Sequence, residues 1–223
     1  MLKAIIFDMD GILIDSEPAW EAAKFEVMQR LCGIKITKAD ADATVGKRVE
    51  DIAYIWCKQF NLAPEKAADI AAAMNKAVIY WIQQHGEALP GVQGALQWLQ
   101  ANGFKVALAS SSNMQVIDTV IDTLQLRRYF ISLNSANELP YGKPHPMVYL
   151  NTAEKLGLSP LECLAIEDSV NGVIAAKAAQ MEVIAIPPQE LQHDPRYRIA
   201  DRQLDSLLEL PALLHGRLAQ SAV

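Results

Sequence analysis

Hydrophobic and polar positions follow two different patterns along the chain. Residues 15–88 carry apolar side chains at helical spacing, such as Trp20, Val27 and Leu31, and no strand-like run interrupts them. Residues 16–18 read Ser-Glu-Pro, a combination that is typical of a helix start. The pattern predicts further helices at residues 49–60 and 64–84.

From residue 89 onward, short apolar runs alternate with amphipathic stretches. A similar apolar run opens the chain. The predicted strands are residues 4–7, 105–109, 130–133, 163–166 and 181–186. The predicted helices of this part are residues 92–101, 114–124, 147–156 and 171–179.

Alternating strands and helices predict an α/β fold, in which a doubly wound parallel sheet carries helices on both faces. The helical block separates the first strand from the other strands, so we interpret this block as an insertion. We therefore expect an α/β core made of residues 1–14 and 89–223, with a helical cap domain at residues 15–88.

Composition narrows the class of protein. Of the 223 residues, 51% are apolar, which is enough for a sizeable core. The net charge is −6 and no basic run occurs, so we expect no nucleic-acid partner. No apolar run is long enough to span a bilayer and no secretion-signal pattern opens the chain, which predicts no membrane association and a cytoplasmic location. Nothing marks an interface, which leaves a monomer or a small homo-oligomer.

The cysteine pattern agrees with this location. The chain has three cysteines, Cys32, Cys57 and Cys163. Their number is odd and their spacing is wide, and no two of them resemble a metal knuckle or a redox dithiol. We expect reduced thiols in a reducing compartment.

The first strand ends in two carboxylates, Asp8 and Asp10. Because side chains alternate along a strand, both carboxylates tend to leave it on the same side, at the end where open α/β sheets place their chemistry. Two carboxylates at such a short distance repel each other unless a cation or a shared proton offsets their charge. Mg²⁺ prefers oxygen ligands of this kind. The alternative interpretation is an ordinary Asp-Gly turn.

Polar residues also follow three other predicted strands. Ser110 and Ser111 precede a helix and favour an anion site, although serines there are often only helix caps. Lys143 lies between a glycine and a proline and could neutralise a phosphate, although a lone lysine is usually a solvated surface residue. Glu167 and Asp168 form a second carboxylate pair, or an acidic helix cap. We assign no role to His85, His145 or His193.

These motifs resemble those of a known family, the haloacid dehalogenase superfamily of phosphatases and phosphomutases. Its four motifs match, in order, Asp8-Met9-Asp10-Gly11, Ser110, Lys143 and Glu167-Asp168. The strings Asp-Met-Asp-Gly-Ile-Leu-Ile-Asp-Ser-Glu-Pro, Lys-Pro-His-Pro and Glu-Asp-Ser-Val-Asn-Gly are similar to one branch of it. That branch holds 2-deoxyglucose-6-phosphate and hexitol-phosphate phosphatases and, more distantly, β-phosphoglucomutase. The resemblance covers essentially the whole chain and implies a Rossmann-like core with an inserted helical cap.

The resemblance implies catalytic roles for three residues. Asp8 would be the nucleophile that forms an aspartyl-phosphate. Asp10 would protonate the leaving oxygen and then activate water. Lys143 would bridge Asp8 and the phosphoryl oxygens. The acid at Asp10 favours phosphoryl transfer over dehalogenation, because the dehalogenases of the family lack it.

The resemblance also implies a Mg²⁺ cofactor. Its ligands would be the Asp8 and Asp168 side chains and the Asp10 backbone carbonyl, with Glu167 in or near the ligand shell. Ser110, Ser111 and nearby backbone N–H groups would hold the transferred phosphoryl group.

Residues 44–48 resemble the cap loop that contacts substrate in this branch. Gly46 would allow close approach of the loop backbone, and Arg48 or Lys47 would bind an anionic or hydroxyl-rich group. The alternative is a solvated basic pair.

Trp20 bears on the choice between hydrolase and mutase. The β-phosphoglucomutases of this branch carry a histidine where this chain has Trp20, so the resemblance favours a hydrolase; Trp20 could also simply pack in a helix. We expect a Mg²⁺-dependent phosphatase of small sugar or sugar-alcohol phosphates. The alternatives are a sugar-phosphate mutase and a non-catalytic phosphate-binding protein, and the presence of Asp8 and Asp10 argues against the latter.

Overall fold

A six-stranded parallel sheet forms the centre of the protein, which we describe from a computed structural model covering residues 2–44 and 46–220, with side chains to residue 216. The strand order is β3-β2-β1-β4-β5-β6, so the first strand lies inside the sheet. The strands are β1 (Ala4–Phe7), β2 (Lys105–Ser110), β3 (Ser132–Ser135), β4 (Cys163–Glu167), β5 (Glu182–Ala185) and β6 (Arg202–Gln203). The predicted doubly wound α/β fold is confirmed.

Helices cover both faces of the sheet because β1 is apolar on both sides. Ile5 and Phe7 belong to the hydrophobic core on one face, whereas Ala4 and Ile6 belong to the core on the other. The first face is covered by α5 (Val92–Ala101), α6 (Met114–Thr123) and α9 (Leu210–Gln220). The second is covered by α7 (Met147–Leu156) and α8 (Val170–Ala178).

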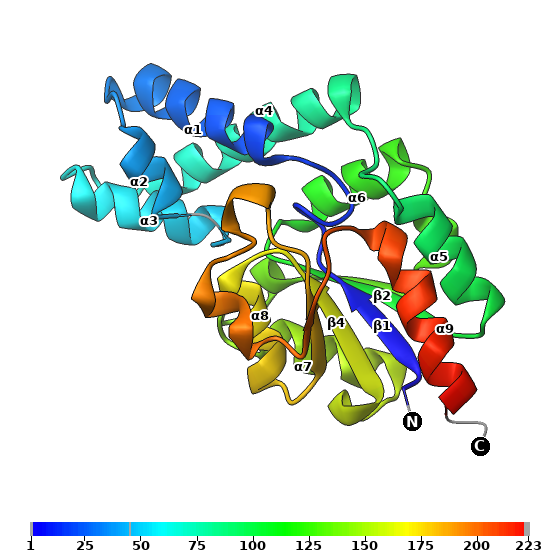
Figure 1. Cartoon of the computed structure of the whole chain (residues 1–223). Coiled ribbons are helices and arrows are strands. Elements are labelled where there is room, and N and C mark those ends of the chain that lie inside the picture. The colour runs from blue at the N-terminus through cyan, green and yellow to red at the C-terminus, as the bar shows by residue number, and fades with distance from the viewer. Residues whose placement is uncertain (1, 45, 221–223) are drawn as a thin grey trace.

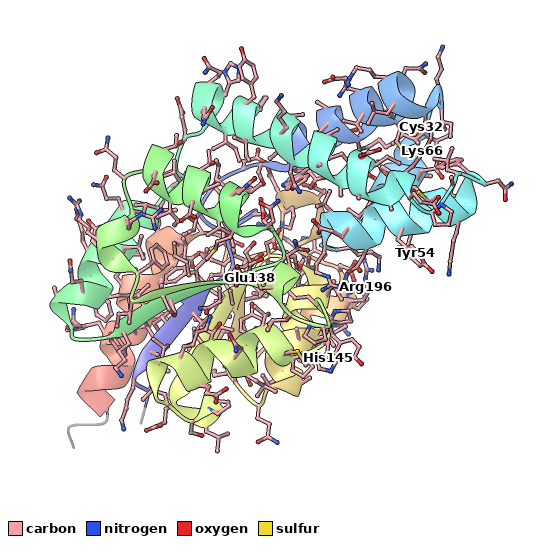
Figure 2. All side chains as sticks on the ribbon, turned by 180° about the vertical axis from the view of Figure 1, so that it is seen from behind. Cys32, Tyr54, Lys66, Glu138, His145 and Arg196 are labelled. Atoms are coloured by element: carbon pink, nitrogen blue, oxygen red, sulfur yellow. The ribbon has the colours of Figure 1, made fainter. Side chains whose placement is uncertain are left out.

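Four helices lie together at the carboxyl end of the sheet, in blue through cyan to blue-green in Figure 1, and we call them the cap. They are α1 (Glu17–Cys32), α2 (Lys38–Asp42), α3 (Val49–Gln59) and α4 (Lys66–His85). The cap has its own apolar cluster, centred on residues such as Met28, Trp56 and Met74. Seen from behind, Cys32, Tyr54 and Lys66 lie on the cap, and Glu138 and His145 lie on the sheet side (Figure 2).

The chain passes between the sheet and the cap twice, and the two passages are joined. Ile14 and Ala88 form an antiparallel bridge, and Leu89 N donates to Leu13 O at 3.0 Å. This pairing agrees with an insertion after β1, while the domain boundaries given above stay a prediction.

The structure differs from the predicted elements in a few places. The strand predicted at 130–133 begins two residues later, because residues 127–129 form a 3₁₀ turn that precedes Phe130. Phe130 leaves the strand pattern to pack edge-on against Phe7, with ring centroids 6.3 Å apart. The short helix α2, strand β6 and helix α9 were not predicted. Among the described residues, no helix combines the length and hydropathy needed to cross a membrane.

Candidate active site

Two carboxylates meet at the carboxyl edge of the sheet because their strands are neighbours. Asp8 directly follows β1, and Glu167 is the last residue of β4, which pairs with β1. The backbone N–H of Asp8 continues the ladder by donating to Ile166 O at 2.9 Å. Glu167 is fully buried and Asp8 is 6% exposed. The sheet therefore brings two acidic side chains into a site that excludes most water.

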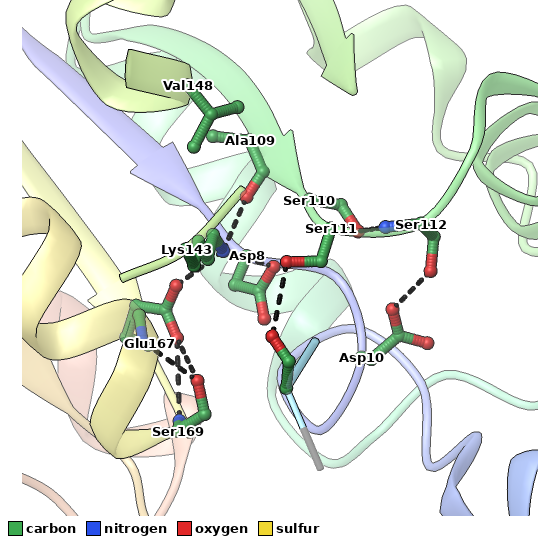
Figure 3. A network of polar contacts seen from close by, with 12 residues as sticks. Asp8, Asp10, Ala109, Ser110, Ser111, Ser112, Lys143, Val148, Glu167 and Ser169 are labelled. Atoms are coloured by element: carbon green, nitrogen blue, oxygen red, sulfur yellow. Dashed lines mark hydrogen bonds and ion pairs between the residues drawn. The ribbon is translucent and has the colours of Figure 1, made fainter. Parts of the chain in front are cut away.

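Lys143 reaches this pair from the loop after β3 (Figure 3). Its Nζ donates to Asp8 Oδ1 at 2.9 Å, to Glu167 Oε1 at 2.5 Å and to Ala109 O at 2.9 Å. Burial alone would lower the pKa of the Lys143 ammonium, but the Asp8 and Glu167 carboxylates outweigh burial and raise the pKa. All three ammonium donors are used, so Lys143 is a fixed positive charge beside Asp8.

Asp8, Glu167 and Asp168 form a cluster of carboxylates whose nearest oxygen atoms all lie within 4.8 Å of one another. Burial, followed by the Glu167 charge, raises the pKa of Asp8 to about 7, with Lys143 opposing the rise. Burial and the Asp8 charge raise the pKa of Asp168 well above its usual range. Three carboxylates near one ammonium, two of them buried and Asp168 partly exposed, offer oxygen donors throughout and fit a hard divalent cation.

Several residues hold these carboxylates in place, and the sequence analysis did not identify them. The Tyr149 hydroxyl donates to Glu167 Oε1, and Ser169 donates to Glu167 Oε2 from its hydroxyl at 3.2 Å. A side chain at Gly172 would overlap the Glu167 carboxylate. The positions of Tyr149 and Gly172 inside helices give no sequence signal for these contacts.

Gly11 shapes the other side of the cluster. Its φ of +75° is a left-handed conformation that glycine adopts without strain, and a Cβ atom there would overlap the Asp168 carboxylate. Tyr197 OH also donates to the backbone carbonyl of Asp168 at 2.6 Å. The turn after β1 therefore both carries Asp10 and leaves room for Asp168.

Asp10 lies beside this cluster and is held by hydrogen-bond donors from three directions. Ser16 Oγ and Trp20 Nε1 donate to Asp10 Oδ1, the latter at 3.3 Å, and Ser112 Oγ donates to Oδ2 at 2.8 Å. Trp20 therefore donates a hydrogen bond to Asp10 and also packs against the hydrophobic core. Ser112 follows the predicted Ser110 and Ser111 and was not singled out, because the sequence cannot show which serine faces Asp10.

The predicted phosphate-binding serines take different positions. Ser110 is fully buried and its hydroxyl accepts a bond from Ser112 N at 3.0 Å. Ser111 Oγ donates to the Gly46 carbonyl of the cap loop at 3.4 Å, and Figure 3 shows the Ser111 hydroxyl beside Asp8. A Cβ atom at Gly46 would lie 3.5 Å from Ser169 Oγ. The cap loop therefore lies directly over the acidic cluster.

Arg48 joins the cap to the sheet domain. Its Nε and Nη2 donate to Asp51 at 2.7 and 2.9 Å, and Nη1 donates to Leu139 O at 2.8 Å and to Ala136 O at 3.3 Å. Lys47 is half-buried, and its side chain makes no hydrogen bond or ion pair within the described part of the chain. Val45, in the same loop, lies outside the described residues.

The site and the fold define a family. A family model described as haloacid dehalogenase-like hydrolase matches residues 2–180, and the chain belongs to this family. The predictions of family and fold are therefore confirmed, and the hexitol phosphatase relative described next confirms the enzyme class, a phosphatase.

Known relatives agree with this assignment. The chain is 42% identical over 212 residues to hexitol phosphatase B of Escherichia coli strain K12, covering 95% of each chain. Its structure is similar to CbbY from Rhodobacter sphaeroides in complex with phosphate, with a TM-score of 0.84 and 25% identity, covering 94% of this chain and 96% of that one. β-Phosphoglucomutase from Clostridium difficile shares the fold, with a TM-score of 0.81 and 24% identity over 94% of this chain and 93% of that one.

Proposed function

We propose that the protein is a Mg²⁺-dependent phosphatase that hydrolyses small sugar or sugar-alcohol phosphates through an aspartyl-phosphate. The observation that carries the proposal is the Lys143 ammonium bound to buried Asp8 beside two further carboxylates, the buried Glu167 and the partly exposed Asp168. The substrate class is supported by the identity to hexitol phosphatase B over nearly the whole chain. A cytoplasmic location and a monomer or small homo-oligomer stay predictions.

In the first half of the reaction, an Asp8 carboxylate oxygen attacks the substrate phosphorus, and the bond from phosphorus to the sugar oxygen breaks. Lys143 is placed to offset negative charge on the oxygens around Asp8. Protonated Asp10 gives its proton to the leaving sugar oxygen. The three donors around Asp10 hold its carboxyl group in one orientation beside Asp8.

In the second half, water attacks the phosphorus of the aspartyl-phosphate. Asp10 takes a proton from this water, the bond between phosphorus and the Asp8 oxygen breaks, and inorganic phosphate leaves. Asp8 and Asp10 return to their starting states, so the cycle needs one water and no other reactant.

The residues that would hold Mg²⁺ are Asp8, Asp168 and Glu167, together with the backbone carbonyl of Asp10. When bound, the ion supplies positive charge that counters the repulsion between phosphate and carboxylates. The charge balance of the cluster, three carboxylates against the Lys143 ammonium, supports a divalent ion in this position.

A mutase of the β-phosphoglucomutase kind is the alternative, since such an enzyme shares the fold. Trp20 argues against it, because an indole N–H donates a hydrogen bond but cannot accept a proton as histidine does.

The test is phosphate release from a panel of hexose, hexitol, pentose and triose phosphates, with Mg²⁺ and with EDTA. We expect Asp8→Asn to lower kcat by at least about 10³-fold while the protein stays folded. Asp118→Asn, a surface carboxylate bound to Arg127, is the matched control and should keep full activity. Wild-type turnover by Asp8→Asn would rule out the covalent mechanism, and conversion of β-glucose 1-phosphate to glucose 6-phosphate without phosphate release would identify a mutase.

A further inference from the structure

Helix α1 presents three chemically distinct side chains along one stripe. Glu17, Trp20 and Lys24 follow one another at spacings of three and four residues, so they lie on the same helix face. Trp20 Nε1 lies 3.3 Å from Asp10 Oδ1. This contact shows that the face points toward the acidic end of the sheet. Trp20 and its two neighbours on the stripe therefore belong to the side of the cap that faces the site.

Lys24 is a buried cation with too few partners. It is 3% exposed, yet its Nζ makes a single hydrogen bond, to Ala41 O at 3.3 Å. That carbonyl already accepts a shorter bond, of 2.7 Å, from the Thr44 hydroxyl. An ammonium has three donors, so within the described chain two donors of Lys24 have no partner, and burying such donors is costly.

Lys143 provides a comparison within the same molecule. It is buried to a similar extent, and all three of its donors are used by Asp8, Glu167 and Ala109. Its pKa is raised, whereas burial lowers the pKa of Lys24. The difference marks Lys24 as a donor group that the folded chain alone leaves incomplete.

Glu17 feels the charges of both Lys24 and Asp10. Glu17 is exposed, yet partial desolvation of its carboxyl raises its pKa; Lys24 opposes the rise and Asp10 adds to it, so both groups lie within electrostatic range. The carboxylate makes no hydrogen bond to any part of the chain that the structure describes. The stripe thus combines unused donors at Lys24 with an unused acceptor at Glu17.

We propose that Lys24 and Glu17 are specificity-determining residues that bind the hydroxyl groups on the non-phosphorylated part of the substrate. A polyhydroxy chain needs both a donor and an acceptor, because each hydroxyl group donates and accepts. This proposal rests on the proposed function, since it names the substrate feature that the same site recognises.

The charges around Lys24 distinguish a neutral substrate tail from a second anion. The carboxylates of Glu17, Glu21 and Asp42 act on Lys24, and among the described residues Lys38 is the cation that opposes them most. This surplus of negative charge disfavours a second phosphate or a carboxylate and favours uncharged hydroxyl groups. The subsite therefore selects monophosphates of neutral polyols and sugars.

The experiment compares kcat/KM for sorbitol 6-phosphate and for p-nitrophenyl phosphate in the wild type and in Lys24→Met. Methionine keeps the length of the buried side chain but removes its donors. We expect the preference for sorbitol 6-phosphate over p-nitrophenyl phosphate to fall by about tenfold or more, mainly through KM. Lys24→Gln, which keeps an N–H donor, should recover part of this preference. Lys58→Met removes an exposed lysine of cap helix α3 that lies over the Tyr54 ring, away from these charges, and should leave kcat/KM for both substrates unchanged.

Three outcomes would overturn the proposal. An equal loss of kcat/KM on both substrates would make Lys24 a structural residue, and kcat/KM values unchanged from the wild type on both substrates would remove it from the subsite. A larger loss on fructose 1,6-bisphosphate than on sorbitol 6-phosphate would show that Lys24 binds a second anion. Failure of the proposed function itself is a separate result, because the wild type would then release no phosphate from any substrate.

Discussion

At the scale of single residues, the site holds charged side chains in a place that is largely shielded from water. Glu167 is fully buried and does not face the solvent, yet it accepts bonds from Lys143 and Tyr149 on one oxygen and from Ser169 on the other. Its carboxylate is therefore fixed in orientation before any cation binds. Residues that fix a metal-binding carboxylate commonly tune the affinity of the site.

Replacing Tyr149 by phenylalanine tests this positioning. Tyr149→Phe keeps the buried ring and removes the hydroxyl that donates to Glu167. We expect Mg²⁺ affinity to fall by about 10-fold or more, measured by titration calorimetry on EDTA-treated protein. Tyr129→Phe is the matched control, since its buried hydroxyl contacts Arg128 instead. Unchanged Mg²⁺ binding in Tyr149→Phe would contradict the role of the hydroxyl.

The residues that sequence could predict are those at strand ends. Asp8, Lys143 and Glu167 could be placed together because parallel strands present their carboxyl ends at one edge. Ser112, Tyr149 and the polar contact of Trp20 could not, because each depends on how a helix or a turn is oriented in space.

At the scale of elements, α3 is tied to the loops of the sheet through Arg48. Asp51, one turn along α3, fixes the guanidinium, which then donates to the carbonyls of Leu139 and Ala136. Gly142 is needed here as well, because a Cβ atom there would lie 2.9 Å from Arg48 Cδ. The cap is thus bonded to the segment that carries Lys143.

The variant Arg48→Ala tests whether Arg48 joins the cap to the sheet domain or binds the substrate. Because the guanidinium donates within the protein, we expect KM to rise to a similar degree for sorbitol 6-phosphate and p-nitrophenyl phosphate. Arg30→Ala, which removes an exposed arginine on α1, should leave both KM values unchanged. A selective rise for the sugar-alcohol phosphate would instead support the sequence-based hypothesis that Arg48 binds the substrate.

At the scale of the whole molecule, the acidic cluster makes stability depend on a bound cation. Asp8, Glu167 and Asp168 repel one another, and Lys143 offsets only part of that repulsion. A cation that binds the folded chain stabilises it by about 2.7 kcal/mol at a concentration 100 times its Kd.

We therefore expect Mg²⁺ to raise the Tm of EDTA-treated protein by roughly 5–10 °C, measured by calorimetric or fluorescence melting. Asp168→Asn should melt at a higher temperature than the wild type in EDTA, because one repelling charge is gone, and should respond less to Mg²⁺. An identical Mg²⁺ response in both proteins would place the ion elsewhere.

The fold was predictable as far as its elements repeat a pattern. The alternation after residue 89 gave the parallel sheet, and the helical spacing of residues 15–88 gave the cap. Strand β6 consists of two exposed residues, so its sequence has no apolar pattern that would predict a strand. The strand predicted at 130–133 was misplaced because Phe130 is apolar for packing against Phe7, outside the strand.

The position of β1 in the sheet has a consequence for the order in which the protein folds. β1 is made first, but its register pairs residue 4 with residues 105 and 163, so its two partners appear only after the entire cap has been synthesised. The cap helices contact one another locally and can assemble early. At that stage Ile5, Ile6 and Phe7 of β1 still lack the strands and helices that bury them in the finished fold. During synthesis we therefore expect a folded cap attached to an exposed apolar strand, which is the part of the growing chain most exposed to aggregation.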